Sequence, residues 1–315
     1  MTFEPSTDPS SIEAARRRRN TIRSADSLAD LVRITGADNE HEAYIAAKDQ
    51  WASAMETIPS SVESAGGLPG TRVFVDGATF WIHGITHAGT DAERRVIRDH
   101  VERFLEADET VYCEQGVRRL YFDDYPDVYE MDDYRWAMAE CQQLDVDSRL
   151  EALPEAGVDR ILEDLTEFAS QFRAATFSLL EASSDLYGSE FASALGDVAS
   201  VFFMTHEGLA TREEYEAFAR SLRAAENPAR LPDLQAYYAR SFLPQHLERE
   251  WLRRHDPELE VLTHARNERM AAYAIHHHEA AKVVHLIVGA AHQPGIAEYL
   301  QRYREGRPLS FDPTG

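Results

Sequence analysis

The chain has 315 residues, of which 55 are Asp or Glu and 32 are Lys or Arg, so its formal net charge is −23. Hydrophobic residues make up 43% of it, a share that is typical of a folded protein with a sizeable core. The negative charge argues against nucleic-acid binding and against docking on an anionic membrane, because both require a basic surface.

Lysine is rare in this sequence, since Lys48 and Lys282 are the only two and all other basic residues are arginines. An acid-rich, lysine-poor surface is typical of a salt-rich cytoplasm, where screening weakens the repulsion between like charges. A GC-rich genome also favours arginine, but it does not explain the excess of acids. We therefore expect a halophilic protein.

The two cysteines, Cys113 and Cys141, are too few for a disulfide framework, and we expect both to be reduced. The sequence has no apolar run of the ~18 residues that a membrane span needs. Its N-terminus also lacks the pattern of a secretory signal. These features predict a soluble, cytoplasmic protein with no membrane span.

Residues 1–65 are predicted to form a helical, partly mobile N-terminal segment, with a helix over 39–56. Four consecutive arginines, at positions 16–19, interrupt the acidic character of the chain. Such a run could contact an acidic partner or a nucleic acid. A solvated helix face or a mobile tail is the simpler interpretation, and we prefer it.

Residues 66–119 are predicted to form the first half of an α/β core. Two β-rich runs flank the pair Asp76-Gly77, which is a strong hairpin signal. A helix with an apolar stripe over 91–108 and a short strand over 110–114 follow. This strand–helix–strand order is the building unit of a parallel sheet.

Residues 120–255 are predicted to be a helical insertion, whose Leu-, Phe- and Tyr-rich faces could make a homodimer contact. The α/β pattern returns in residues 256–305, with a helix over 257–281, a strand over 282–288 and a closing helix from Gly295; residues 306–315 form a tail. The predicted fold is thus α/β, a mixed central sheet flanked by helices and interrupted by a large helical insertion.

One motif occurs twice in matching surroundings. Gly84-x-x-His87 and Gly289-x-x-His292 each follow a predicted strand, and Glu114 ends the strand between them. Because parallel strands present their carboxyl ends at one edge of a sheet, we expect the two histidines and Glu114 to converge there. Each motif alone would more often be a turn or a helix cap, and a strand-end glutamate is usually solvated.

Two imidazoles and a carboxylate are a ligand set for a divalent cation such as Mn²⁺, Co²⁺ or Zn²⁺. Glu114 has a competing role as the general base that acts on a metal-bound water. His83, Gly84 and Gly289 are candidates for positions around the ion or the substrate, although for His83 we prefer a cross-strand partner. The tract of three histidines at positions 276–278 is expected on the surface, because consecutive helical residues point about 100° apart.

The segments VDGATFWIHGITH, YCEQGVRRL, RNERMA and VHLIVGAAHQPGIAEYL resemble the TraB/PrgY superfamily. That superfamily includes the Tiki and GumN-type proteins and, more distantly, ChaN-like and erythromycin-esterase-like folds. The resemblance covers about residues 72–120 and 260–301. It places the two histidines of the family on His87 and His292 and its strand-end glutamate on Glu114.

The same resemblance places the family's Arg-Asn motif on Arg266 and Asn267 and its Glu-x-x-x-Arg arginine on Arg118. Arg266 would then stabilise an oxyanion, and Asn267 would position the substrate or a ligand. The sequence departs from the family at Ala265, where many members carry a glutamate, and it lacks the C-terminal membrane helices of PrgY-like members. These departures argue against a membrane-linked role.

The resemblance implies a metal-dependent hydrolase, and its Tiki branch suggests a peptidase that acts on a peptide or a small molecule. The alternative is a non-catalytic protein of the same fold that sequesters a peptide or another small ligand, with haem as one candidate.

Overall fold

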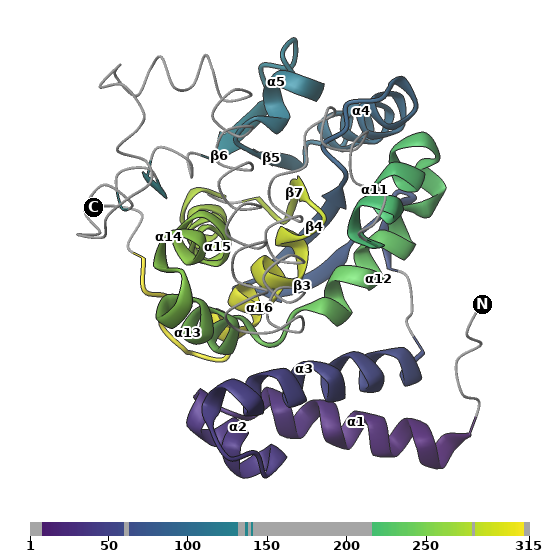
Figure 1. Cartoon of the computed structure of the whole chain (residues 1–315). Coiled ribbons are helices and arrows are strands. Elements are labelled where there is room, and N and C mark those ends of the chain that lie inside the picture. The colour runs from purple at the N-terminus through teal and green to yellow at the C-terminus, as the bar shows by residue number, and fades with distance from the viewer. Residues whose placement is uncertain are drawn as a thin grey trace, which may run out of the picture.

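The computed structural model describes residues 8–59, 63–131, 136–137, 140, 216–278 and 281–311. The helices that the sequence predicts between residues 141 and 215 lie outside the described residues. Within the described part, the chain has the predicted α/β architecture, with a mixed five-stranded sheet between helices (Figure 1).

The central sheet has the strand order β3-β4-β7-β5-β6. β3 runs antiparallel to β4, whereas β4, β7, β5 and β6 are parallel to one another. The last strand in the sequence therefore lies in the middle of the sheet. The strands are β3 (Thr71–Val75), β4 (Ala78–Ile85), β5 (Thr110–Glu114), β6 (Val128–Met131) and β7 (Val283–Gly289), and a small ribbon of β1 (Ser64–Ala65) and β2 (Leu68–Pro69) precedes them.

The hairpin between β3 and β4 turns at the predicted pair. Asp76 and Gly77 both have left-handed backbone angles, with φ of 47° and 89°. Two successive residues with positive φ are what a type I′ turn requires, and aspartate followed by glycine tolerates them best. The turn fixes the register in which Val75 pairs with Ala78.

Each face of the sheet is covered by helices (Figure 1). On one face, α4 (Asp91–Glu106) packs Ile97, Val101 and Phe104 against β4, β5 and β7. On the other face, α15 (Arg266–His277) and α16 (His292–Arg304) cover the apolar side chains of β3, β4 and β7. Both faces are buried, which explains why β7 is apolar at nearly every position.

The N-terminal helices form a separate layer beside the sheet domain (Figure 1). They pack on helices from the C-terminal half of the chain through one continuous core. This core includes Leu31 and the stacked rings of Tyr44 and Trp251. The N-terminal layer consists of α1 (Pro9–Arg23), α2 (Leu28–Thr35) and α3 (Glu40–Thr57). The later helices beside it are α11 (Glu216–Glu226), η2 (Pro228–Arg230), α12 (Leu231–Ser241) and α13 (Gln245–His255). The arginine run lies on α1, as the helix-face interpretation predicted, and three of its four side chains are exposed.

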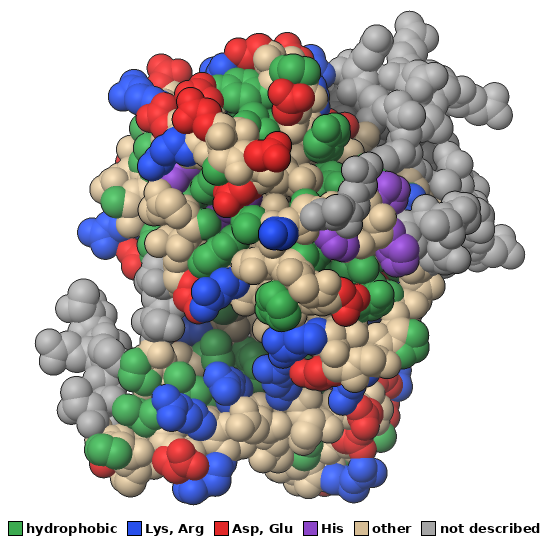
Figure 2. Space-filling view, turned by 180° about the vertical axis from the view of Figure 1, so that it is seen from behind, with side chains coloured by type: hydrophobic (Ala, Val, Ile, Leu, Met, Phe, Trp, Pro, Cys, Tyr) green, Lys and Arg blue, Asp and Glu red, His purple; other side chains and the backbone are tan. Residues whose placement is uncertain are grey.

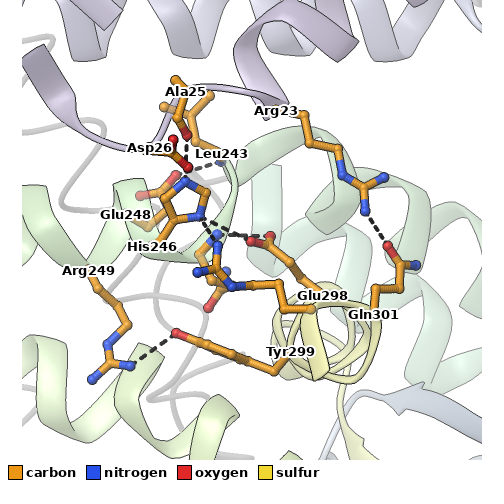
Figure 3. Close-up of polar contacts among 12 residues, drawn as sticks. Arg23, Ala25, Asp26, Leu243, His246, Glu248, Arg249, Glu298, Tyr299 and Gln301 are labelled. Carbon is orange, nitrogen blue, oxygen red and sulfur yellow. Dashed lines mark hydrogen bonds and ion pairs between the residues drawn. The ribbon is translucent and has the colours of Figure 1, made fainter. Parts of the chain in front are cut away.

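Polar contacts around His246 join the N-terminal layer to α16 (Figure 3). His246 Nε2 lies 2.7 Å from the carbonyl oxygen of Ala25, which only accepts, so this nitrogen carries a hydrogen. Arg302 donates to His246 Nδ1 at 3.0 Å, and Arg23 of α1 donates to Gln301. The helix that begins with His292 is therefore fixed at its far end by the N-terminal segment.

Three element boundaries differ from the sequence-based expectation. β6 lies inside the segment 120–255, which was predicted to be helical. It forms a strand because its backbone pairs in parallel with that of β5. α16 begins at His292 rather than Gly295, since a proline is tolerated in the first turn of a helix. The predicted helix from 257 is divided into α14 (Pro257–Glu260), one turn of π-helix, η3 (Val261–Ala265), and α15.

Acidic and basic side chains are interspersed over the face that Figure 2 shows. Within the described residues, no helix combines the length and the apolar character that crossing a membrane requires.

Candidate functional site

The carboxyl ends of β4, β5 and β7 bring together the residues that the sequence singled out. Glu114 is the last residue of β5, His87 follows β4 by two residues, and His292 begins α16 just after β7. His87 Nε2 lies 3.1 Å from Glu114 Oε2, and His292 Nε2 lies 3.4 Å from Glu114 Oε1. The two histidines therefore converge on one carboxylate, as expected from the strand order.

Glu114 is fully buried and is held by two further donors. Arg266 donates to Oε1 at 2.8 Å, and the backbone N–H of Gly289 donates to Oε2 at 2.9 Å. The Arg266 side chain is 1% exposed, as is that of Glu114. The strand end thus places a guanidinium, a backbone donor and two imidazoles around a single buried carboxylate.

A row of buried polar side chains fixes His292. Asn267 Oδ1 lies 2.6 Å from His292 Nδ1, so Nδ1 carries the hydrogen and Nε2 faces Glu114 with its lone pair. Asn267 in turn donates to Gln245 Oε1 at 2.8 Å, and His264 Nδ1 lies 3.0 Å from the same oxygen. Gly295 permits this arrangement, because a Cβ there would overlap the side chains of Asn267 and Gln245.

His87 lies in a left-handed backbone conformation, with φ of 61°, and Glu93 holds the loop that contains it. Glu93 is fully buried and accepts two hydrogen bonds from Thr86, one from its backbone N–H and one from its hydroxyl, both at 2.7 Å. Tyr121 donates to Glu93 at 2.6 Å and accepts from the backbone N–H of Gly89 at 2.9 Å. The backbone is therefore fixed on both sides of His87.

The charges in the site shift the pKa values of its members. Burial alone would raise the pKa of Glu114, but the adjacent His292 and His87 hold it well below its usual range. Burial also acts to lower the pKa of His87, yet the Glu114 carboxylate outweighs it and the net shift is upward. For His292, burial prevails and the pKa is lowered. The two histidines thus favour the ionised form of Glu114, and Glu114 in turn favours the protonated form of His87 more than that of His292.

The side chain that Gly289 lacks would point between the site residues. A Cβ atom at this position would be 3.0 Å from His87 Nε2 and 3.5 Å from both Glu114 Oε2 and His292 Cδ2. This narrow gap, called the hollow below, would be closed by any side chain at position 289. The His87 side chain, which borders it, is 24% exposed.

The residues around this hollow suit a divalent cation in their chemistry. His87 Nε2 is buried and makes no hydrogen bond with any described residue that satisfies the usual geometry, so a ligand could bind this atom once it is unprotonated. His292 presents Nε2 because Asn267 engages its other nitrogen, the arrangement that orients metal-binding histidines. Even so, no group of three or more His, Cys, Asp or Glu side chains in the described part of the chain is so arranged that it could hold a metal ion. To bind a cation, Glu114 would have to give up one of the hydrogen-bond donors that it now contacts.

Two of the residues that were predicted near the ion or the substrate contact other parts of the structure instead. His83 faces His285 across the β4–β7 pair, as the cross-strand alternative proposed, and it does not contact the centre. Arg118 donates to the carbonyl oxygens of Tyr125 and Val128, so it holds the connection between β5 and β6. His276 and His277 are exposed and bond to carbonyls of their own helix, which agrees with a surface tract.

Sequence reasoning did not identify Gln245, His264 or Glu93. The spacing Thr90-x-x-Glu93 is that of a capping box and marks Glu93 as a helix-start residue. In the structure the backbone N–H of Glu93 donates to Thr90, as in a capping box, but its carboxylate accepts from Thr86 and not from the backbone of Thr90. Gln245 and His264 carry no comparable local signal, because their partners are distant in the sequence.

A scan against models of protein families gave no match, and comparisons with the curated proteins and with the solved structures gave none either. The resemblance to the TraB/PrgY superfamily therefore rests on the motif residues alone.

Proposed function

We propose that this protein is a metal-dependent hydrolase whose centre is formed by His87, Glu114 and His292, with Arg266 beside it. One observation supports the proposal above all others: two Gly-x-x-His histidines and a buried arginine meet at a single carboxylate, Glu114. A merely structural ion pair would need neither imidazole. A peptide or a small molecule with a hydrolysable carbonyl group is the proposed substrate.

In this proposal His87, His292 and one oxygen of Glu114 would hold a divalent cation such as Mn²⁺, Co²⁺ or Zn²⁺. When bound, such an ion polarises a carbonyl and lowers the pKa of water towards ~7. The guanidinium of Arg266 lies beside Glu114, and in this proposal it would stabilise the oxyanion as it develops. Asn267 would keep His292 in the tautomer that exposes Nε2.

Glu114 has two possible roles within this proposal, and both use its present position. As a ligand, it would direct one oxygen at the cation and keep the other on its backbone donor, Gly289. As a general base, it would accept a proton from water through the oxygen that now contacts His87. Replacing Glu114 by Gln separates the two, because an amide oxygen can still bind a cation weakly but cannot take up the proton.

The test combines metal analysis with hydrolysis assays on the full chain. We expect protein purified without chelator to contain about one divalent cation per chain, and the variants His87→Ala and His292→Ala to lose it. We expect hydrolysis of a mixed peptide library to depend on the same residues. His277→Ala is the matched control, since this histidine is exposed on α15. Stoichiometric metal without hydrolysis would reject the enzyme and favour the sequestering protein, whereas absence of both would reject the site.

A further inference from the structure

Beneath α4, on the face of the sheet that this helix covers, the structure brings together a second group of titratable side chains, two of which are buried. His83 on β4 and His285 on β7 are 0% and 1% exposed, and Glu109 directly precedes β5. His83 Nε2 lies 3.0 Å from His285 Nδ1, and His285 Nε2 lies 2.8 Å from Glu109 Oε2. These three residues are called the His83–His285–Glu109 triad below.

The hydrogen bonds of the triad fix the number of its protons. His83 Nδ1 lies 2.9 Å from the carbonyl oxygen of Pro69, which only accepts, so this nitrogen carries a hydrogen. A neutral His83 then accepts at Nε2, and His285 must donate from Nδ1. His285 Nε2 would consequently face the Glu109 carboxylate without a hydrogen, and two acceptors do not form a bond at 2.8 Å.

The contact between His285 and Glu109 therefore requires one more proton. The three hydrogen bonds contain three hydrogens, whereas two neutral imidazoles and an ionised carboxylate supply only two. This count is the same whether the additional proton is assigned to His83, to His285 or to Glu109. Because the carboxylate contributes one negative charge, the triad with its additional proton is neutral as a whole.

We infer that the His83–His285–Glu109 triad holds one shared proton at neutral pH and acts as a pH-sensitive connection between the three strands that carry the site. β4 leads to His87, β7 leads to His292, and β5 ends at Glu114. Glu109 directly precedes β5 and His285 lies in the first half of β7, whereas His83 lies near the end of β4, four residues before His87. Loss of the shared proton would release Glu109 from His285. The inference does not depend on the proposed hydrolase activity.

The surroundings of the triad favour its neutral form. The ring of Phe104 stacks on His285 at 3.7 Å, so α4 covers the pair with an apolar surface. Burial lowers the pKa of both His83 and His285 to about 3, which opposes a positive charge on either ring, and burial raises the pKa of Glu109, which favours the additional proton on its carboxyl group.

Few other charged groups face the triad from the elements packed against it. From α4, His100 lies near His83 and also lowers its pKa. From β3, Arg72 lies over the ring of Trp81, which stacks on His83, and Arg72 pairs with Glu63 at 3.5 Å. Neither group contacts the triad directly through a hydrogen bond, so the protons are shared among the three members.

The test compares the pH dependence of unfolding in the wild-type chain and in Glu109→Gln. The Gln amide can donate to His285 Nε2, so it keeps the hydrogen bond without a titrating proton. The unfolding constant changes tenfold per pH unit for each proton that one state binds in excess. Because all other groups titrate equally, we expect the ratio of the unfolding constants, Glu109→Gln over wild type, to fall about tenfold per pH unit between pH 5 and 7.5.

Glu106→Gln is the matched control, since Glu106 is an exposed acid at the C-terminal end of α4, three residues before Glu109, and its ratio should not vary with pH. A ratio for Glu109→Gln that is equally flat would overturn the inference. If Glu109→Gln does not fold, NMR of the wild type decides. The ring ¹⁵N shifts of both histidines and the carboxyl ¹³C shift of Glu109 should change together in one transition above pH ~7.5. Separate transitions at the ordinary pKa values, ~4.3 for the carboxyl and ~6.5 for the rings, would overturn it.

Discussion

Arg266 and Glu114 form an ion pair at 2.8 Å in which both side chains are only 1% exposed. Residues so deeply buried are rarely charged unless they are paired, and here the pair also contacts two histidines. Its members come from the end of a central strand and from the first turn of α15. The ion pair therefore fixes a helix of one face of the sheet to the edge where the site lies.

Removing one partner of this pair should destabilise the protein strongly. Arg266→Ala leaves the carboxylate of Glu114 buried without its cation, and such a loss typically costs about 3–5 kcal/mol. Urea denaturation of the variant would measure it. Arg230→Ala is the control, because Arg230 and Asp233 form an exposed pair and its loss should change stability by less than about 1 kcal/mol. Equal effects of the two substitutions would contradict the assignment of a buried pair.

Filling the hollow beside Gly289 should affect ligand binding more than stability. In Gly289→Ala the new methyl group would lie 3.0 Å from His87 Nε2, which requires the imidazole to shift by a few tenths of an ångström. We expect affinity for a divalent cation to fall about 10- to 100-fold, the usual effect of disturbing the surroundings of metal ligands. Calorimetric titration with Zn²⁺ and Mn²⁺ measures this, and a thermal melt checks the fold. Unchanged affinity would show that the hollow is not the binding position.

The buried histidine His264 should make the protein less stable in acid. Burial, and next the positive charges of Lys48 and Arg249, hold the pKa of His264 well below its usual range. The folded chain thus keeps this ring neutral while the unfolded chain protonates it below pH ~6.5, so stability is present above that pH and is lost as the pH falls. Each such proton corresponds to about 1.4 kcal/mol per pH unit.

In His264→Gln this contribution is absent. Between pH 6.5 and 4.5 the free energy of unfolding should therefore fall less steeply than in the wild type, by about 1.4 kcal/mol per pH unit. Gln can still donate to Gln245 Oε1, which now lies 3.0 Å from His264 Nδ1. His277→Gln is a suitable comparison, because His277 is exposed. Denaturation curves at four pH values would show the difference, and parallel curves for wild type and His264→Gln would contradict the prediction.

Salt should stabilise the protein if its acidic surface is an adaptation to high salt. The net charge of −23 opposes the compact state, and the Debye length shortens from about 10 Å at 0.1 M salt to about 3 Å at 1 M. We therefore expect the melting temperature to rise between 0.1 and 2 M KCl. A melting temperature that stays constant over this range would remove the argument for a halophile.

Local patterns predicted the elements better than their arrangement. The Asp76-Gly77 turn, the stripe on α4 and the two Gly-x-x-His motifs are each specified by a few neighbouring residues, and the structure places them as expected. β6 was missed because four residues in an acidic segment carry no alternation that distinguishes a strand. A cross-strand partner was expected for His83, but its identity as His285 was not, and the contact of Gln245 with Asn267 was also not predicted, since both contacts link residues that only the folded chain brings together.

The meeting of His87, Glu114 and His292 followed from one general rule, that parallel strands end at the same edge. The rule does not say which donors surround a carboxylate, so the backbone contact of Gly289 and the row from His292 to Gln245 were not predicted. What the site does chemically remains a prediction.

The position of β7 has a consequence for biosynthesis. β4 and β5 leave the ribosome long before β7, and until residue 289 has emerged each of them lacks the neighbour that joins the two halves of the sheet. Unpaired strand edges are templates for aggregation, so the nascent chain passes through a stage in which it depends on protection, for instance by a chaperone. If translation stops before β7, the released fragment contains the β3–β4 pair and the β5–β6 pair without the strand that joins them. The fragment also lacks His292.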